Sequence, residues 1–233
     1  GTYNARYYEG RYLEGVLAGK MSKKGVVGYV GAFPIPEVLQ GINAFTLGMR
    51  SVNPQAQVKL IWVNSWYDPG KERDAANTLI KLGADILAYA PSGISIVTMA
   101  EAQGVYTLGY YSDMSKFGPK TNLTSLVHTW GDYYIKEVEE VLAGRWKSKK
   151  VLGGLREGMI KMAPVNSAVT ADAREKMLVD ERAIIDGKLH PFAGPIYDQD
   201  GKERVAAGKI MTDDEMNNMN FLVKGVDGSM AKN

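Results

Sequence analysis

The sequence contains no cysteine and only two histidines, and both scarcities exclude kinds of chemistry. Without cysteine, the chain can form no disulfide, no thiolate metal site and no thiol nucleophile. The two histidines, His128 and His190, do not stand at the spacing of zinc ligands. The sequence therefore predicts neither a metal site nor a cofactor.

Long apolar runs and a strong charge imbalance are also missing. No stretch approaches the roughly 20 consecutive apolar residues that a membrane-spanning helix requires. The formal net charge is +2, because 28 Lys and Arg residues are interspersed with 26 Asp and Glu residues. A nucleic-acid-binding surface usually shows a basic stripe or patch, and this sequence has none. We therefore expect no membrane span and no nucleic-acid partner.

The sequence instead shows a regular alternation of short apolar runs and amphipathic segments. The apolar runs predict strands at 26–32, 58–64, 86–89, 105–109 and 123–127, and helical periodicity predicts helices at 3–20, 38–51, 68–82, 95–103, 131–143 and 170–186. Asp68-Pro69 marks one helix start, because Asp accepts bonds from free N–H groups and Pro lacks a donor that would have no partner. Strands that alternate with helices are typical of a parallel sheet, so we expect an α/β fold.

Aromatic and polar side chains follow the predicted strands, in the loops after each of them. Because the carboxyl ends of parallel strands meet at one edge of a sheet, we expect these loops to share one rim. Rings at such a rim can stack on a flat solute, while Ser, His and Asp select it by hydrogen bonds. A nucleobase or another heterocycle fits this combination best. The predicted ligand-binding residues are Phe33, Trp66, Ser92, Tyr111, Asp113, His128 and Trp130.

Each of these residues also has a purely structural interpretation. A single aromatic side chain anchors a loop about as often as it contacts a ligand, and His128 is equally ambiguous. Asp113 could serve simply as the cap of an Asx-turn. His190 precedes Pro191 and is expected to be structural. The helix starts at this rim offer free N–H groups, but no Gly-rich phosphate loop is present, so ordinary capping by solvent is favoured.

Several long segments resemble the basic membrane protein family of bacterial solute-binding proteins, which includes purine receptors of ABC importers. These segments are TYNARYYEGRYLEGVLAGKM, GYVGAFPIPEVLQGINAFTLGMRSVNP, WVNSWYDPGKERDAA, SDMSKFGPK and IIDGKLHPFAGPIYDQDGK. The resemblance spans almost the whole chain. It implies a periplasmic binding protein fold of type I, in which a cleft between two lobes closes on a ligand. It also implies that the protein is a periplasmic or cell-surface lipoprotein and that its partner is a membrane permease.

The resemblance assigns base stacking to Phe33 and Trp66 but leaves the identity of the ligand open. Family members commonly carry an acid where this chain has Tyr111 and a charged residue where it has His128. A phenol in place of the acid removes a strong charge-assisted acceptor for ribose hydroxyls or a base N–H. A nucleobase or another small aromatic solute therefore agrees with the sequence as well as a nucleoside does.

Family proportions imply that about one hundred further residues of the first lobe normally precede the segment found here. We therefore expect a truncated protein with three parts: a first-lobe remnant at 1–24, the second lobe at 25–145, and a return to the first lobe at 146–233. Two other functions stay open: a ligand-sensing domain of a transcription regulator, and a remnant that binds nothing. An α/β enzyme such as a nucleoside hydrolase ranks below both, because the sequence shows no convincing nucleophile, carboxylate pair or metal cluster.

Overall fold

The centre of the protein is a mostly parallel β-sheet, seen in a computed structural model that describes residues 1–230. Within those residues the sheet has seven strands in the order β11-β3-β2-β4-β5-β6-β8. All neighbouring pairs from β11 to β6 run parallel, and β8 pairs antiparallel with β6. The strands are β2 (Val26–Gly31), β3 (Gln57–Trp62), β4 (Ile86–Tyr89), β5 (Tyr106–Tyr111), β6 (Asn122–His128), β8 (Ile160–Met162) and β11 (Val226–Asp227).

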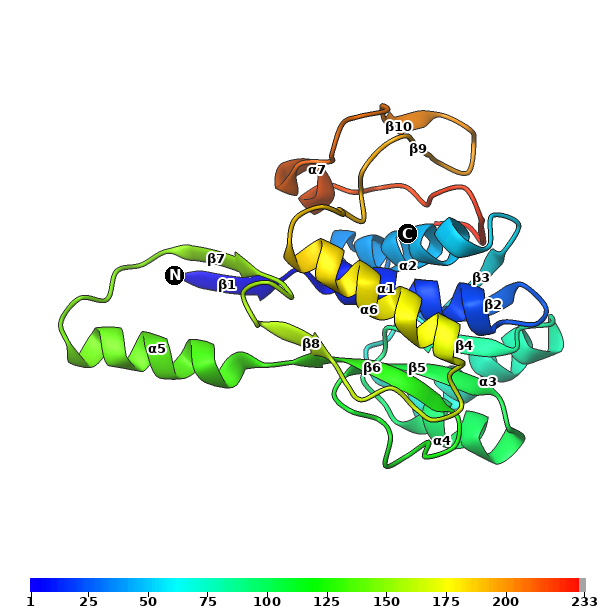
Figure 1. Cartoon of the computed structure of the whole chain (residues 1–233). Helices are drawn as coiled ribbons and strands as arrows, with labels where there is room; N and C mark the ends of the chain where they lie inside the picture. The colour runs from blue at the N-terminus through cyan, green and yellow to red at the C-terminus, as the bar shows by residue number, and fades with distance from the viewer. Residues whose placement is uncertain (231–233) are drawn as a thin grey trace.

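Helices cover both faces of this sheet (Figure 1). One face carries α1 (Tyr7–Met21), α2 (Pro36–Val52) and α6 (Ala171–Ile185), and the other carries α3 (Pro69–Lys81) and α4 (Ser95–Gln103). The short helix α7 (Asp213–Asn217) packs on α2, and the hairpin of β9 (Ile196–Tyr197) and β10 (Glu203–Val205) lies beside it. Burial on both faces explains why the predicted strands read as continuous apolar runs.

The closest helix pair in the body is α1 and α2, which meet through glycines. A Cβ atom on Gly15 of α1 would collide with the Phe45 carbonyl oxygen, and a Cβ atom on Gly48 of α2 would collide with the Tyr12 carbonyl oxygen. Each glycine therefore lets the backbone of the other helix approach. The pair joins the start of the chain firmly to the central sheet.

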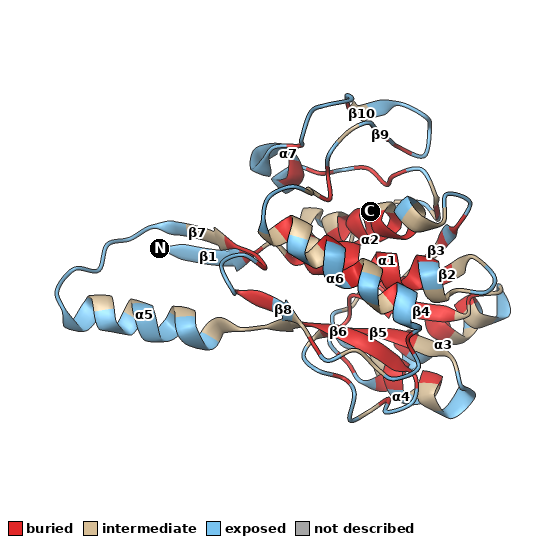
Figure 2. Ribbon diagram, viewed as in Figure 1, coloured by how far each residue is buried: buried red, intermediate tan, exposed pale blue. Residues whose placement is uncertain are grey.

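An arm projects from this main body, and we define it as β1 (Thr2–Ala5), α5 (Trp130–Leu142) and β7 (Lys150–Gly153). In the arm, β1 and β7 form a parallel two-stranded sheet, and α5 lies beside it (Figure 1). No residue of α5 is buried, so the helix is drawn without red in Figure 2. Its apolar side chains Ile135, Val138, Val141 and Leu142 are exposed, with Leu142 at 82%.

The predicted α/β alternation is confirmed, and each predicted strand and helix is present with ends shifted by a few residues. The exception is the helix expected from residue 3, because Thr2–Ala5 is a strand and α1 begins only at Tyr7. The expected division of the chain at 24/25 and 145/146 stays a prediction. Helix α1 from the first part and strands β8 and β11 from the last part pack with the central block. Among residues 1–230, none of the helices has the length and apolar character needed to cross a bilayer.

Candidate functional site

The strand order brings most of the predicted site residues to one edge of the sheet. Read along that edge, Trp66 follows β3, Phe33 follows β2 and Ser92 follows β4, while Tyr111 ends β5 and His128 ends β6. Neighbouring strands lie about 4.8 Å apart, so the loop after β2 and the end of β5 are separated by about 10 Å. This spacing leaves two groups of rings on either side of the end of β4.

The first group is the pair Phe33 and Trp66, whose ring centroids lie 5.3 Å apart at an interplanar angle of 54°. Trp66 is 40% exposed, so much of its indole surface stays open for contact with a solute. The backbone N–H of Ser92 donates to the Trp66 carbonyl oxygen at 2.8 Å, while the Ser92 residue itself is exposed. The pair and Ser92 therefore form one connected surface.

A buried carboxylate holds the two loops of this first group. Glu72, in the first turn of α3, is fully buried and accepts bonds from the Asp68 backbone N–H at 3.0 Å and from the Ser95 hydroxyl. It also lies against Gly93, where a Cβ atom would meet the Glu72 carboxylate. Asp68 caps α3 as predicted, accepting from the Lys71 backbone N–H at 3.1 Å. Glu72 thus fixes the loops after β3 and β4 relative to each other.

The second group is a continuous aromatic cluster, which we define as Tyr7, Tyr110, Tyr111, His128 and Trp130. His128 is central to it: its ring centroid lies 4.9 Å from Tyr111, 5.1 Å from Trp130 and 5.2 Å from Tyr7. The Tyr110 and Tyr111 ring centroids lie 3.6 Å apart, with the rings tilted by 35°. Tyr7 is the first residue of α1, and the sequence pattern did not predict that this residue would lie at the rim. Its position follows from the packing of α1 on the sheet.

Tyr111 has an unusual backbone conformation at the end of β5. Its φ of +66° lies in the left-handed region, which a bulky side chain rarely adopts. Such strain persists only where the surroundings fix it, and it is concentrated at functional sites. Here it turns the phenol ring onto Tyr110 and against Tyr7.

A buried ion pair supports the cluster from below. Arg11 and Glu14 of α1 are almost completely buried, and Arg11 Nη1 lies 2.8 Å from Glu14 Oε2. The Arg11 guanidinium lies 3.6 Å from the Tyr110 ring centroid and donates to the Tyr89 carbonyl oxygen at the end of β4. Glu14 accepts from the Leu126 backbone N–H of β6 at 3.2 Å. One helix thereby fixes the carboxyl ends of β4, β5 and β6.

The aromatic cluster is uncharged at neutral pH. Burial raises the pKa of Tyr7, Tyr110 and Tyr111, so the phenols keep their protons. Burial lowers the pKa of His128, so the imidazole is neutral. Its buried Nε2 has no hydrogen-bond partner among the described residues. The cluster can therefore offer neutral donors and acceptors and several ring faces.

Asp113 and His190 both make local hydrogen bonds to the backbone. Asp113 is exposed, and its Oδ1 accepts from the Ser115 backbone N–H at 2.9 Å, which is the Asx-turn geometry. His190 Nδ1 accepts from the Phe192 backbone N–H at 3.1 Å. Across residues 1–230, no group of three or more His, Cys, Asp or Glu residues is arranged to hold a metal ion.

Known proteins that are similar to this chain include the following three. A Brucella abortus protein named as purine-binding is 49% identical over 99% of this chain and 66% of its own length. A Haloferax volcanii protein named as a putative ABC transporter glucose-binding protein is 34% identical over 99% of this chain and 56% of its length. A solved transcriptional activator of the comK gene from Bacillus halodurans has a TM-score of 0.74 and 25% identity, covering 81% of this chain and 66% of that one.

The chain thus spans between half and two thirds of the length of these three proteins. Solved ABC transporter solute-binding proteins share the fold at lower identity, which confirms the expected type I periplasmic binding protein architecture. A family model described as "ABC transporter substrate-binding protein PnrA-like" matches residues 1–191. The chain belongs to this family of substrate-binding proteins.

Proposed function

We propose that this chain captures a small aromatic solute for an ABC importer, and that the solute is a purine base or nucleoside. The observation that carries the proposal is the arrangement of rings at one sheet edge, with the Phe33–Trp66 pair on one side of β4 and the aromatic cluster on the other. Ring faces of this kind stack on a flat heterocycle, and the neutral hydroxyls and imidazole supply its hydrogen bonds. The binding residues are Phe33, Trp66, Ser92, Tyr111, Asp113, His128 and Trp130.

The arm belongs, in this proposal, to another lobe, which faces the main body and completes the ligand cleft. Its two-stranded parallel sheet and the exposed apolar face of α5 are typical of a part of a larger layered unit, because parallel sheets are normally covered on both faces. The relatives are longer than this chain, which agrees with such a unit. The ligand would then lie between the sheet edge of the main body and the arm.

Release to a membrane permease, rather than chemical conversion, is the expected fate of the solute. Among the described residues of the site, no nucleophile is paired with a base, and the carboxylates of Glu72 and Asp113 accept backbone N–H bonds within their loops. The family supports a location outside the cytoplasmic membrane, in the periplasm or on the cell surface. Lipid attachment as the anchor is part of the proposal.

Thermal unfolding of this chain in the presence of candidate solutes tests the proposal. Adenine, guanine, hypoxanthine and their nucleosides are compared with glucose and with unrelated heterocycles. A solute that binds only the folded chain at 100 times its Kd stabilises it by about 2.7 kcal/mol, so the melting temperature rises. We expect the rise with at least one purine.

Two variants locate the binding. Trp66→Ala should abolish the rise in melting temperature, because the open indole face is lost. Tyr67→Ala is the matched control, since Tyr67 is a neighbouring aromatic residue that is 68% exposed. A purine-induced rise that survives Trp66→Ala would remove this ring from the site, and the failure of all purines would overturn the proposed function.

The similarity to the Bacillus halodurans activator favours one second candidate, a ligand-sensing domain of a regulator. Both functions begin with solute capture at the same rim, so the melting experiment tests their common step. Docking on a permease would follow in the first case and DNA binding in the second. Co-purification with either partner separates the two.

A further inference from the structure

Glu37 lies at the same edge of the sheet as the proposed site. It is the second residue of α2, four residues beyond Phe33, and it is half-buried. The helix N-terminus favours a carboxylate at this position. The Asn4 side-chain amide of β1 donates to Glu37 Oε2 at 3.4 Å. Glu37 therefore lies where the arm meets the main body.

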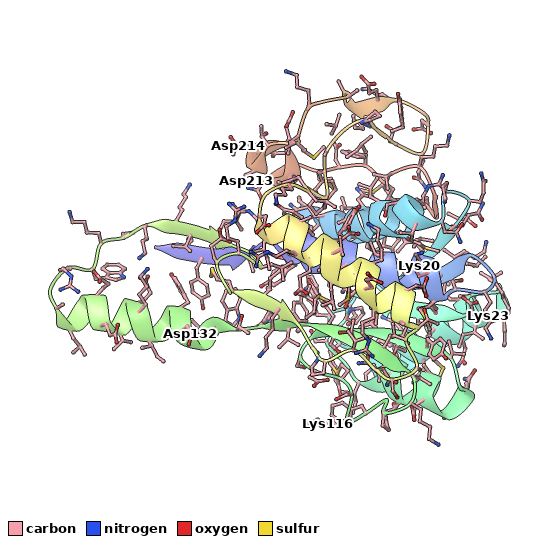
Figure 3. The ribbon with its side chains drawn as sticks, in the orientation of Figure 1. Lys20, Lys23, Lys116, Asp132, Asp213 and Asp214 are labelled. Carbon is pink, nitrogen blue, oxygen red and sulfur yellow. The ribbon has the colours of Figure 1, made fainter. Side chains whose placement is uncertain are left out.

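The carboxylate is also close to the aromatic cluster. Burial is the largest cause that raises the pKa of Tyr7, Tyr110 and Tyr111. The charge of Glu37 is a smaller cause that acts in the same direction. Asn4, whose amide donates to Glu37, stands only three residues before Tyr7 of the aromatic cluster. Glu37 further borders a hollow of about 250 Å³ between β1, α2 and α7, so the residue faces open space. Asp213 of α7, seen in Figure 3, lines the same hollow.

The surrounding charges leave the carboxylate as a negative centre. The phenols and the imidazole of the cluster are neutral at neutral pH, because burial raises the pKa of Tyr111 and lowers the pKa of His128. The nearby positive charge of Arg11 is paired in the interior with Glu14. A solute on the cluster thus meets neutral rings and, beside them, the carboxylate of Glu37.

We propose that Glu37 is a specificity-determining residue, which selects purines with an amino group against acidic oxopurines; this inference rests on the proposed function. A carboxylate accepts hydrogen bonds and donates none. Adenine and guanine are neutral and present an exocyclic amino group, which can donate to it. Urate is an anion at neutral pH, so its charge is repelled by Glu37 and its deprotonated edge offers no donor there. Hydrogen bonds to a charged acceptor are about twice as strong as neutral ones.

Calorimetric titration of the chain with adenine, guanine and urate tests this selection. We expect the chain to bind at least one aminopurine more tightly than urate by a factor of about 10 or more. Glu37→Gln should weaken aminopurine binding by about 10- to 100-fold and narrow the difference from urate, because the amide carries no charge. Glu37→Asp should keep the preference for the aminopurine.

The control is Asp214→Asn, which removes one negative charge from an exposed position on α7 outside the hollow (Figure 3). It should leave the affinities unchanged, and melting without ligand confirms that each variant is folded. Glu37→Gln with wild-type affinity and wild-type preference overturns the role of Glu37 alone. The absence of binding by every purine overturns the proposed function and this inference with it.

Discussion

The two histidine side chains respond to acid in the same direction. Burial is the main cause that lowers the pKa of both His128 and His190, because a desolvated imidazole resists protonation. At His190 the geometry adds a reason, since Nδ1 accepts from the Phe192 N–H at 3.1 Å and a protonated Nδ1 cannot accept. Folding therefore favours the neutral form at both positions.

This preference predicts that acid destabilises the chain partly through the histidines. Below the ordinary histidine pKa of about 6.5, the unfolded chain takes up protons before the folded chain does, so the free energy of unfolding falls as pH falls. His190→Asn keeps an acceptor oxygen for the Phe192 N–H but cannot titrate. Urea unfolding at pH 7.5 and 5.5 should show a smaller loss for this variant than for the wild type. Equal losses in both proteins would contradict the prediction.

Some site residues reach the rim because of the strand they follow, and others because of the way their helix packs. The rings of Phe33, Trp66 and Trp130 directly follow strands, so the α/β pattern alone predicts them at one rim. Tyr7 and Glu37 stand inside helical segments, and they reach the rim only because α1 and α2 pack as they do. Such residues carry no local signal of function in a single sequence.

At the scale of elements, the crossing of α1 and α2 depends on which glycines face the partner helix. In α2, a Cβ atom on Gly41 would meet its nearest neighbour, the Tyr29 hydroxyl, at an ordinary 3.5 Å, whereas a Cβ atom on Gly48 would collide with the Tyr12 carbonyl. Alanine gains about 0.5–1 kcal/mol over glycine inside a helix. Overpacking costs about 1–3 kcal/mol or more.

The two glycines therefore predict opposite outcomes in the same helix. Gly41→Ala should leave the chain as stable or stabilise it by up to about 1 kcal/mol, because the methyl group fits. Gly48→Ala should destabilise it by about 1–2 kcal/mol or more, because the backbone of α1 must move. The free energy of unfolding from urea titration checks both. A stabilising Gly48→Ala would show that the helices do not approach this closely.

The elements that the sequence predicts best show either a helical period or a continuous apolar run. The helix at 95–103 and the apolar strand at 86–89 agree with the structure residue for residue. Strands β1, β7, β8 and β11 have only two to four residues and mix polar with apolar side chains, so neither a period nor an apolar run marks them. These short strands are also the ones that join distant parts of the chain.

On the scale of the whole molecule, the main body and the arm differ in how they are held. The body encloses a continuous core that includes α1, α2 and the central strands. The elements of the arm contact one another through side chains. The ring centroids of Tyr3 and Trp130 lie 5.3 Å apart, and Lys149 Nζ lies 2.6 Å from Glu137 Oε1. Exposed ion pairs contribute about 0–1 kcal/mol each.

Hydrogen exchange of the isolated chain should reveal this difference directly. Amides of α1 and β2 are expected to exchange only through opening of the whole body, since their surroundings are buried. Amides of α5 should exchange much faster through local opening, because none of its residues is buried. Peptide-resolved mass spectrometry measures both in one sample, with α1 as the internal standard. If the amides of α5 were as protected from exchange as those of α1, the arm would be an integral part of the body. Another lobe would then not be needed to cover the apolar face of α5.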